Sequence, residues 1–309
     1  MLQYLIKRFI NSIIVLWIVM TLTFVLMHAI PGGPFTAEKN LPPVVKANIE
    51  ARYRLNDPLT EQYMDYVDNL LHGDLGPSFK YVGRSVNDII SESFPVSFEL
   101  GVESIIIALL AGIPAGVFAA YRRNRWQDRT LNLLTTLGIA VPGFVLAALL
   151  VDIFAMKLGI LPAAMWNDWS SRILPAVALA AMPMAFITRL TRSSMLDVLG
   201  QDYIKTARAK GLGNVNILFR HALPNALIPV VTYIGPMVAG ILTGSFVIET
   251  IFAIPGLGRY FVTSIYNRDY TVILGVTVFY SAIIILMNML VDIIYPLLDP
   301  RIKLGEKED

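Results

Sequence analysis

Six stretches of the chain are almost entirely apolar over about 20 residues, the length that a helix needs to cross the hydrocarbon core of a bilayer. The segments between them are polar, so the pattern predicts an all-α polytopic membrane protein with six transmembrane helices. The predicted spans cover residues 9–30, 96–121, 131–156, 173–190, 226–248 and 272–295. Prolines fall inside several of these spans, where a missing N–H allows a bend. Pro114, Pro142, Pro183 and Pro236 are among them.

The composition excludes an ordinary soluble enzyme. Of the 309 residues, 55% are apolar and only 16% are charged, whereas soluble domains average about 25% charged residues. A net charge of +2 gives no reason to expect a nucleic-acid partner. The chain has no cysteine, so disulfides, iron–sulfur clusters and a thiol nucleophile are excluded.

The basic residues orient the chain. Fifteen Lys and Arg side chains lie before the first span, between the second and third, between the fourth and fifth, or after the sixth. The short loops on the opposite side hold only Lys157, Arg172, Arg259 and Arg268. The positive-inside rule therefore places both termini in the cytoplasm. Residues 1–30 would form the cytoplasmic N-terminus and an uncleaved first span, and residues 299–309 a cytoplasmic tail.

A polar stretch of 65 residues, 31–95, separates the first two spans on the outer side. It carries nine acidic and six basic residues and is too long for a bare loop. Within it, residues 61–71 read as a helix with Tyr63, Tyr66, Val67 and Leu70 on one face. Residues 72–77 read as turns. The stretch therefore predicts a small extracytoplasmic cap.

No catalytic or cofactor motif is present. The sequence lacks a Walker A loop and the H-E-x-x-H, G-x-S-x-G and C-x-x-C patterns. Its three histidines are far apart, so no shared metal site is expected. Five acids lie in or beside the spans, and for each we expect solvation at the interface or an ion pair rather than a catalytic role. They are Glu99, Glu103, Asp152, Glu249 and Asp292.

Two glycine pairs, Gly112-x-x-x-Gly116 and Gly240-x-x-x-Gly244, predict close helix packing in the second and fifth spans. For these glycines and for the prolines within the spans, packing is a better expectation than lining a path through the membrane. The residues that would line such a path stay open.

The most informative segment is the cytoplasmic loop between the fourth and fifth spans. Residues 202–210 combine helix formers with an acidic start and a basic end, and Gly211 follows as a stop. Pro224 and Pro229 mark the entry to the next span. We expect a short helix against the cytoplasmic membrane face that offers Tyr203, Ala207 and Leu212 to a partner. On composition alone, an ordinary basic inner loop is the competing interpretation.

The spacing within this loop resembles a known pattern. Lys205-Thr206-Ala207, three residues, Gly211, nine residues and His221-Ala-Leu-Pro224 resemble the E-A-A-x3-G-x9-I-x-L-P loop of bacterial ABC importer permeases. Lys205, Thr206 and His221 depart from that pattern. The variant T-A-R-A-K-G-L with R-H-A-L-x-N-A-L is similar to the peptide and nickel branch of the family. Further segments resemble the B-type permeases of oligopeptide importers: residues 31–35, 76–80, 85–88, 254–258, 267–270 and 299–300.

The resemblance implies the membrane domain of a type I ABC importer over residues 96–298, with a coupling loop at about 191–225, in the bacterial inner membrane. It implies a homologous second permease in a heterodimer, two cytoplasmic ATPase subunits that use ATP and Mg²⁺, an external peptide-binding protein and a peptide substrate. No cofactor is expected in this chain. The residues expected to couple to the ATPase are Tyr203, Thr206, Ala207, Arg208, Lys210, Gly211, Leu212, Leu223 and Pro224.

Three alternatives stay open. A permease for dipeptides, nickel or glutathione would share the same fold. A membrane-embedded enzyme is opposed by the lack of a paired catalytic set. A self-sufficient channel is opposed by the elaborate cytoplasmic loop.

Overall fold

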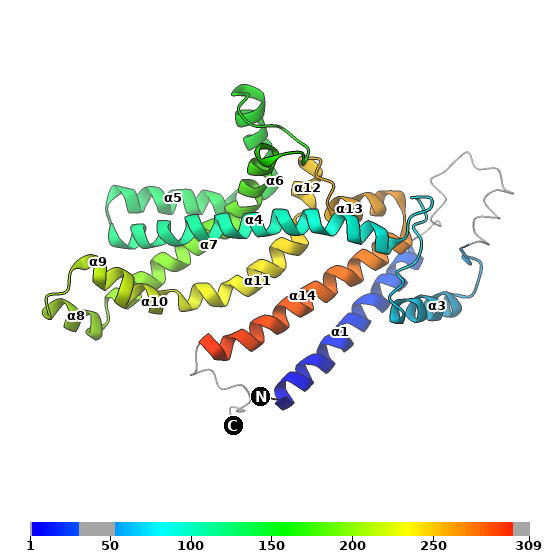
Figure 1. Ribbon diagram of the computed structural model, residues 1–309, viewed down its shortest axis with the longest axis horizontal. Helices are drawn as coiled ribbons and strands as arrows, with labels where there is room; N and C mark the ends of the chain where they lie inside the picture. The colour runs from blue at the N-terminus through cyan, green and yellow to red at the C-terminus, as the bar shows by residue number, and fades with distance from the viewer. Residues whose placement is uncertain (1, 31–52, 299–309) are drawn as a thin grey trace.

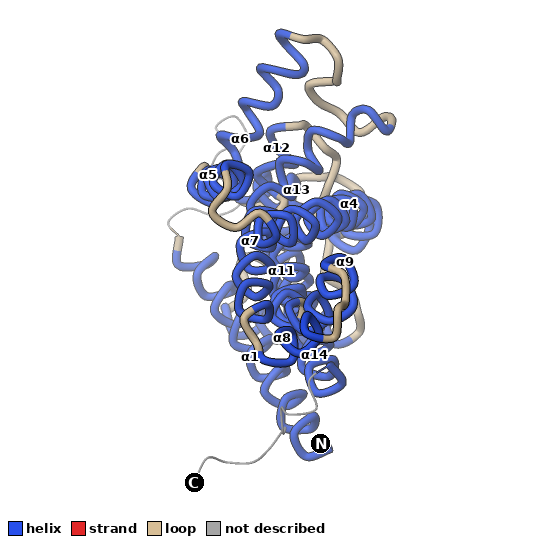
Figure 2. The backbone as a smooth tube through the Cα atoms, turned by 90° about the vertical axis from the view of Figure 1, so that its left-hand side faces the viewer, coloured by secondary structure: helices blue, strands red, loops and turns tan. Residues whose placement is uncertain are grey.

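The computed structural model describes residues 2–30 and 53–298, and within these ranges regular structure is helical apart from an isolated bridge between Pro77 and Ser85 (Figure 2). The predictions for residues 31–52, the tail 299–309 and the Asp292 side chain lie outside the described part. The long helices are α1 (Leu2–Ala29), α4 (Val86–Tyr121), α5 (Trp126–Ala140), α7 (Trp169–Leu199), α11 (Ile228–Gly244) and α14 (Tyr270–Leu298). Shorter elements join them: α3 (Leu59–Leu71), α6 (Gly143–Leu150), η1 (Val151–Lys157), α8 (Asp202–Ala209), α9 (Asn214–Asn216), η2 (Ile217–Ala222), α10 (Leu223–Ala226), α12 (Phe246–Ile251) and α13 (Leu257–Asn267).

Five continuous helical stretches are long and apolar enough to cross a membrane, and they match the first, second, fourth, fifth and sixth predicted spans. The predicted third span is instead a pair of helical segments bent by 109°. The break falls at Val141 and Pro142, whose backbones are extended, with ψ of 122° and 139°. Because Pro142 has no N–H to continue the helix, the chain turns there. The described residues therefore contain six spans only if this bent pair is counted as one span.

Helices α4 and α7 form the centre of the bundle and lie side by side along their length (Figure 1). A Cβ atom at Gly116 would lie 2.6 Å from the carbonyl oxygen of Thr188, and one at Gly112 would lie 3.0 Å from that of Met184. Only glycine permits this backbone approach, so the packing prediction for this pair is confirmed. It is wrong for Gly240 within this chain, since nothing lies within 4 Å of a Cβ built there.

The outer cap is anchored on α1. The predicted helix is confirmed as α3, and its Tyr63 hydroxyl lies 2.7 Å from the Thr21 hydroxyl of α1. The Phe24 ring is 5.2 Å from that of Tyr63 and 6.5 Å from that of Tyr66. The cap ends earlier than predicted, because a capping box starts α4 at Val86. Residues 86–95 therefore belong to the long helix.

Four of the five acids singled out in the sequence fall within the described side chains, and three of them form ion pairs. Arg172 contacts both Glu99 and Glu103, and Lys157 contacts Asp152 at 2.6 Å. These pairings confirm the expectation. It is wrong for Glu249, which is fully buried and accepts hydrogen bonds from two serine hydroxyls and a backbone N–H instead of meeting solvent or a cation.

Candidate functional site

The loop between the predicted fourth and fifth spans folds into a compact helical unit, α8–α9–η2–α10, between α7 and α11 (Figure 1). We call these residues, 202–226, the coupling unit. The predicted helix is confirmed as α8, with Asp202 in its first turn and Arg208 in its last. Both charges complement the helix dipole. Lys205, where the resembled pattern has Glu, contacts Asp202 at 2.8 Å, and both side chains are largely exposed.

A Schellman motif ends α8. The N–H of Leu212 donates to the carbonyl of Ala207 at 3.3 Å, and the N–H of Gly211 donates to that of Arg208 at 2.9 Å. Gly211 takes the left-handed conformation that this motif requires, with φ of +79°. The predicted stop is therefore confirmed, and it fixes the direction in which the chain leaves the helix.

One face of α8 is buried against the rest of the chain. Ile204 is fully buried and Ala207 is 6% exposed. They share an apolar cluster with Val117 of α4, Met195 of α7 and Ile217 of η2. The coupling unit is thereby packed onto the common end of the two central helices.

This packing corrects part of the sequence prediction. Ala207 and Leu212 do not face outward, because both belong to the cluster beneath α8, Ala207 as a buried member and Leu212 packed against it. In a helix of eight residues, the few apolar positions are needed to bury the helix on its own chain. Apolar character in the loop therefore marked the inward face, not the exposed one.

The exposed face of α8 is polar. Thr206, Arg208, Lys210 and Gly211 are exposed, and Tyr203 is 43% exposed. The Tyr203 hydroxyl accepts a hydrogen bond from the Asn225 amide at 2.8 Å. This bond links the start of α8 to the end of the unit.

The last two predicted coupling residues lie at the other end of the unit. Leu223 is half-buried and packs against the cluster beneath α8, whereas Pro224 is exposed. The Tyr203 hydroxyl also donates to the carbonyl of His221 at 3.4 Å, although the two residues are 18 apart in the sequence. The structure therefore brings Tyr203 close to the segment that holds Leu223 and Pro224.

A buried ion pair that was missing from the sequence prediction braces α7 at this end. Arg192 donates to Asp128 through Nε at 2.6 Å and Nη2 at 2.8 Å. The Asn124 N–H and the Asn132 amide also donate to Asp128, which is 2% exposed. A signal was present in the sequence: Asp128 is the only acid among the basic residues of segment 122–129. A carboxylate retained there points to a specific arginine partner.

Within the described residues, no group of three or more His, Asp or Glu side chains could hold a metal ion. The features that stand out are contacts between helices: the close packing of α4 on α7, the ion pair that joins α7 to α5, and the capped helix α8 on the surface. Together they define a polytopic membrane protein whose two central helices carry a compact surface unit at one end.

The chain belongs to the family of binding-protein-dependent transport system inner membrane components. The family model matches residues 112–304, and the model of the family's N-terminal part matches residues 1–101. The chain is therefore a multi-pass inner-membrane permease component of such a transport system, as the resemblance implied.

Two named relatives are similar to this chain along nearly its whole length. The chain is 54% identical over 307 residues to the dipeptide transport system permease protein DppB of Bacillus subtilis (strain 168), which covers 99% of this chain and 100% of that protein. It is 48% identical over 305 residues to the oligopeptide transport system permease protein OppB of Escherichia coli (strain K12), covering 98% and 100%.

A solved structure shares the fold. A chain of the MetNI methionine ABC transporter in an inward-facing conformation superposes with a TM-score of 0.57 at 18% identity, covering 68% of this chain and 96% of that one. At this identity the likeness concerns the fold alone. The predicted fold class, the membrane domain of a type I ABC importer, is confirmed.

Proposed function

We propose that this chain is the transmembrane permease subunit of an ATP-driven peptide importer. It forms half of the translocation path with a homologous second permease, receives peptide from an external binding protein, and is driven by two cytoplasmic ATPase subunits that use ATP and Mg²⁺. The chain itself hydrolyses nothing. The observation that carries the proposal is the α8 helix, which is packed on one face and polar and exposed on the other.

The contacts of α8 support a coupling role. Its buried face holds it against α4 and α7, so a displacement of α8 moves the ends of both helices. The Arg192–Asp128 pair attaches α7 to the first turn of α5, and the close contact at Gly116 attaches α7 to α4. Because packed elements of this kind move as a unit, closure of an ATPase dimer on the exposed face of α8 would reach the membrane part of the chain.

The outward face of α8 is therefore the surface that we assign to the ATPase. Tyr203, Thr206, Arg208 and Lys210 would make the contacts. Gly211 would set the angle of the helix, and Ala207, Leu212 and Leu223 would hold it in place from beneath. Pro224 would make a contact at the edge.

Peptide is the substrate class that the relatives favour. The chain is 54% identical to a dipeptide permease and 48% identical to an oligopeptide permease, so we propose dipeptides and longer peptides alike as substrates. We infer that the binding protein selects the peptide and that this chain mainly lets it pass.

The orientation of the termini is part of the proposal. Both termini and the coupling unit lie in the cytoplasm, as the positive-inside rule requires. The chain has no cysteine of its own, so single cysteines can be placed cleanly. A membrane-impermeant maleimide should label a cysteine at Asp74 in intact cells and one at Asn214 only after the membrane is opened; the reverse result would overturn the orientation.

The function is tested by purifying the chain from its native membrane under mild conditions and identifying the subunits that accompany it. We expect two ABC ATPase chains and a second permease, with ATPase activity that rises when peptide-loaded binding protein is added. Recovery of the chain alone, or as a homo-oligomer with hydrolytic activity, would contradict the proposal and favour the membrane-enzyme alternative.

A further inference from the structure

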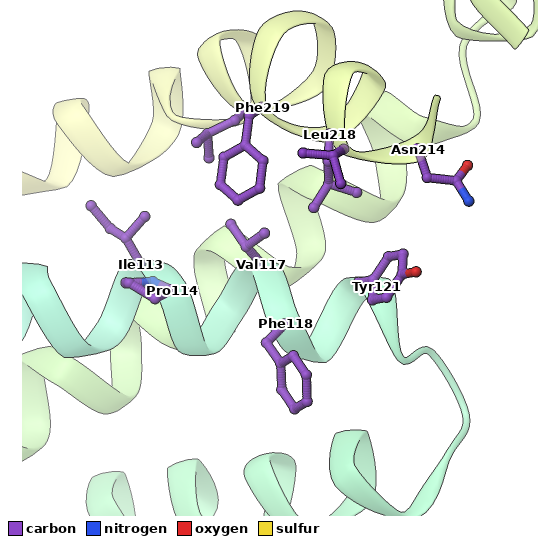
Figure 3. A pocket seen from close by; sticks show the side chains of 10 residues that line it. Ile113, Pro114, Val117, Phe118, Tyr121, Asn214, Leu218 and Phe219 are labelled. Carbon is purple, nitrogen blue, oxygen red and sulfur yellow. The ribbon is translucent and has the colours of Figure 1, made fainter. Parts of the chain in front are cut away.

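An apolar groove opens beside the coupling unit, between the last turns of α4 and the π-helical segment η2 (Figure 3). Its volume is about 410 Å³, within the range of pockets that hold small ligands. Val117, Phe118 and Tyr121 line it from α4, and Val215, Leu218 and Phe219 from the coupling unit. Phe219 is 58% exposed and Val215 73%, so the groove is open on one side.

The groove lies at the inner boundary of the membrane. It begins at Ile113, inside the apolar part of α4, and ends at Tyr121, the last residue of that helix. Arginines follow immediately at positions 122 and 123. The floor of the groove is therefore at the depth of acyl chains and its mouth at the depth of headgroups, where aromatic and basic side chains gather.

Two arginines directly follow lining residues in the sequence: Arg122 follows Tyr121, and Arg220 follows Phe219. The guanidinium of Arg122 lies 5.4 Å from the centre of the Tyr121 ring, and its buried Nε has no hydrogen-bond partner among the described residues. Arg220 lines a second hollow that shares Val215 and Phe219 with the groove. Within the described part of the chain neither arginine forms an ion pair, in contrast to Arg192. No acidic residue lines either hollow.

We propose that this groove binds an anionic glycerophospholipid of the inner leaflet, with one acyl chain along Val117 and Phe219 and the phosphate at Arg122 and Arg220. The guanidinium group matches a phosphate in charge and in hydrogen-bond geometry. The inference depends on the proposed orientation in the membrane but not on the peptide substrate.

The same observations disfavour protein occupants. A second permease obeys the positive-inside rule as well, so its own inner rim would bring positive charge against Arg122 and Arg220. An ATPase subunit lies in the cytosol and would not reach the part of the groove that is sunk into the span of α4. A lipid meets both the depth and the charge of the site.

The test places the photoreactive residue p-benzoylphenylalanine at Phe219 in the full chain, within the purified transporter reconstituted into nanodiscs of phosphatidylcholine and phosphatidylglycerol in equal amounts. After illumination, intact mass spectrometry identifies what is attached. We expect whole-lipid adducts with phosphatidylglycerol enriched about fivefold over phosphatidylcholine, as one well-placed arginine would give. Arg122→Gln combined with Arg220→Gln should bring the ratio to that of the bulk lipid.

Two controls keep the result interpretable. Arg125→Gln, in the same basic loop but outside the groove, should leave the enrichment unchanged. The probe at Leu133 of α5, which is 60% exposed, should report the bulk lipid ratio. If the Phe219 variant does not assemble, the probe moves to Val215.

Three results would overturn the inference: adducts to a second permease or ATPase chain, equal labelling by the two lipids, or enrichment that persists without the two arginines. The cysteine at Asn214 is labelled separately, in intact cells and after the membrane is opened, because a nanodisc leaves both faces of the transporter open to the reagent. A wrong orientation is therefore distinguished from a groove that is correctly placed but empty of lipid.

Discussion

The two ends of this molecule, which we assign to the outer and the cytoplasmic side of the membrane, are held together by different contacts. At the outer end, Asp269 is fully buried and gathers the Ser78 hydroxyl and the backbone N–H groups of Phe79 and Lys80, the latter two at 3.1 and 3.2 Å. Ser78 and Asp269 are 191 residues apart in sequence. The cap is thus joined to the segment between α13 and α14 by directional bonds to one carboxylate.

A second buried carboxylate stabilises the same end. Glu249 of α12 accepts the Ser97 hydroxyl at 2.8 Å and the Arg259 N–H at 3.1 Å. A Cβ at Gly256 would lie 2.4 Å from its Oε2, so the turn that follows α12 is fitted around this side chain. Buried polar networks that are fully satisfied fix a single geometry.

At the opposite end, the coupling unit relies mainly on apolar contacts and a backbone cap, while the buried Arg192–Asp128 pair braces the neighbouring α7. The coupling unit has Ile204 and Ala207 buried beneath it, while its charged side chains point to solvent. Apolar contact is non-directional and permits small displacements. The comparison therefore separates two kinds of attachment: buried carboxylates with several donors fix the outer end, whereas apolar contacts hold the coupling unit, which under the proposed function is the part that an ATPase moves.

The largest effect is expected when the outer network loses its centre. Asp269→Ala leaves the Ser78 hydroxyl and two backbone N–H groups without their buried acceptor, and the free energy of unfolding should fall by about 3 kcal/mol or more. The measurement is the apparent melting temperature of the purified complex. Asp68→Asn is the control, because the Asp68 side chain is 73% exposed and its carboxylate lies 3.8 Å from His72 Nδ1, which is also exposed. An unchanged melting temperature would show that residues 76–80 are held by other contacts.

At the inner end, Gly211→Val should abolish transport while sparing the fold. A β-branched residue cannot adopt φ of +79° without strain, so the Schellman turn would open and α8 would change direction. We expect assembled complexes whose ATPase no longer responds to peptide-loaded binding protein and whose peptide uptake is lost. Gly211→Asn should retain much of the activity, since asparagine tolerates the left-handed region.

The matched control for this variant lies two residues further on. Gly213 has φ of −66° and open space around its Cα, so Gly213→Val adds the same side chain without the strain. It should transport normally. Equal loss in both valine variants would mean that bulk in the loop, not the angle of α8, causes the defect. Normal peptide uptake by Gly211→Val would contradict the proposal that transport depends on the direction of α8.

The extent to which the sequence predicted this structure follows from the same contrast. Local signals were sufficient at the inner end: an acidic start, a basic end and a glycine stop placed α8 within one residue. What local signals could not give was the surface that covers the apolar face of α8. That depends on Val117 and Met195, which lie in other helices and have no marked pattern of their own.

Fewer local signals pointed to the contacts at the outer end. Residues 76–80 and 267–270 stood out as two separate segments of resemblance, but only the fold shows that Ser78 and Asp269 meet. The prediction for Glu249 is wrong for the same reason, because one of its serine partners, Ser97 of α4, is 152 residues away in the sequence. Pro142 indicates where the chain bends, but nothing in the sequence predicts that the angle is 109°.

The smallest effect concerns an exposed carboxylate at the outer end, and it separates burial from charge. Asp168 caps α7 and accepts hydrogen bonds from the Ser170 hydroxyl and the Ser171 N–H, which hold its pKa below the ordinary value of 3.8. Its contribution is therefore present above that value and is lost as pH falls through the lower pKa of the folded state. Asp168→Asn keeps a side-chain acceptor at the cap, so at pH 7 the melting temperature should change far less than with Asp269→Ala. In melting curves recorded between pH 3 and pH 7, the variant should lose less stability on acidification than the parent. A drop at pH 7 as large as that of Asp269→Ala would show that charge alone, and not burial with several donors, stabilises the outer end.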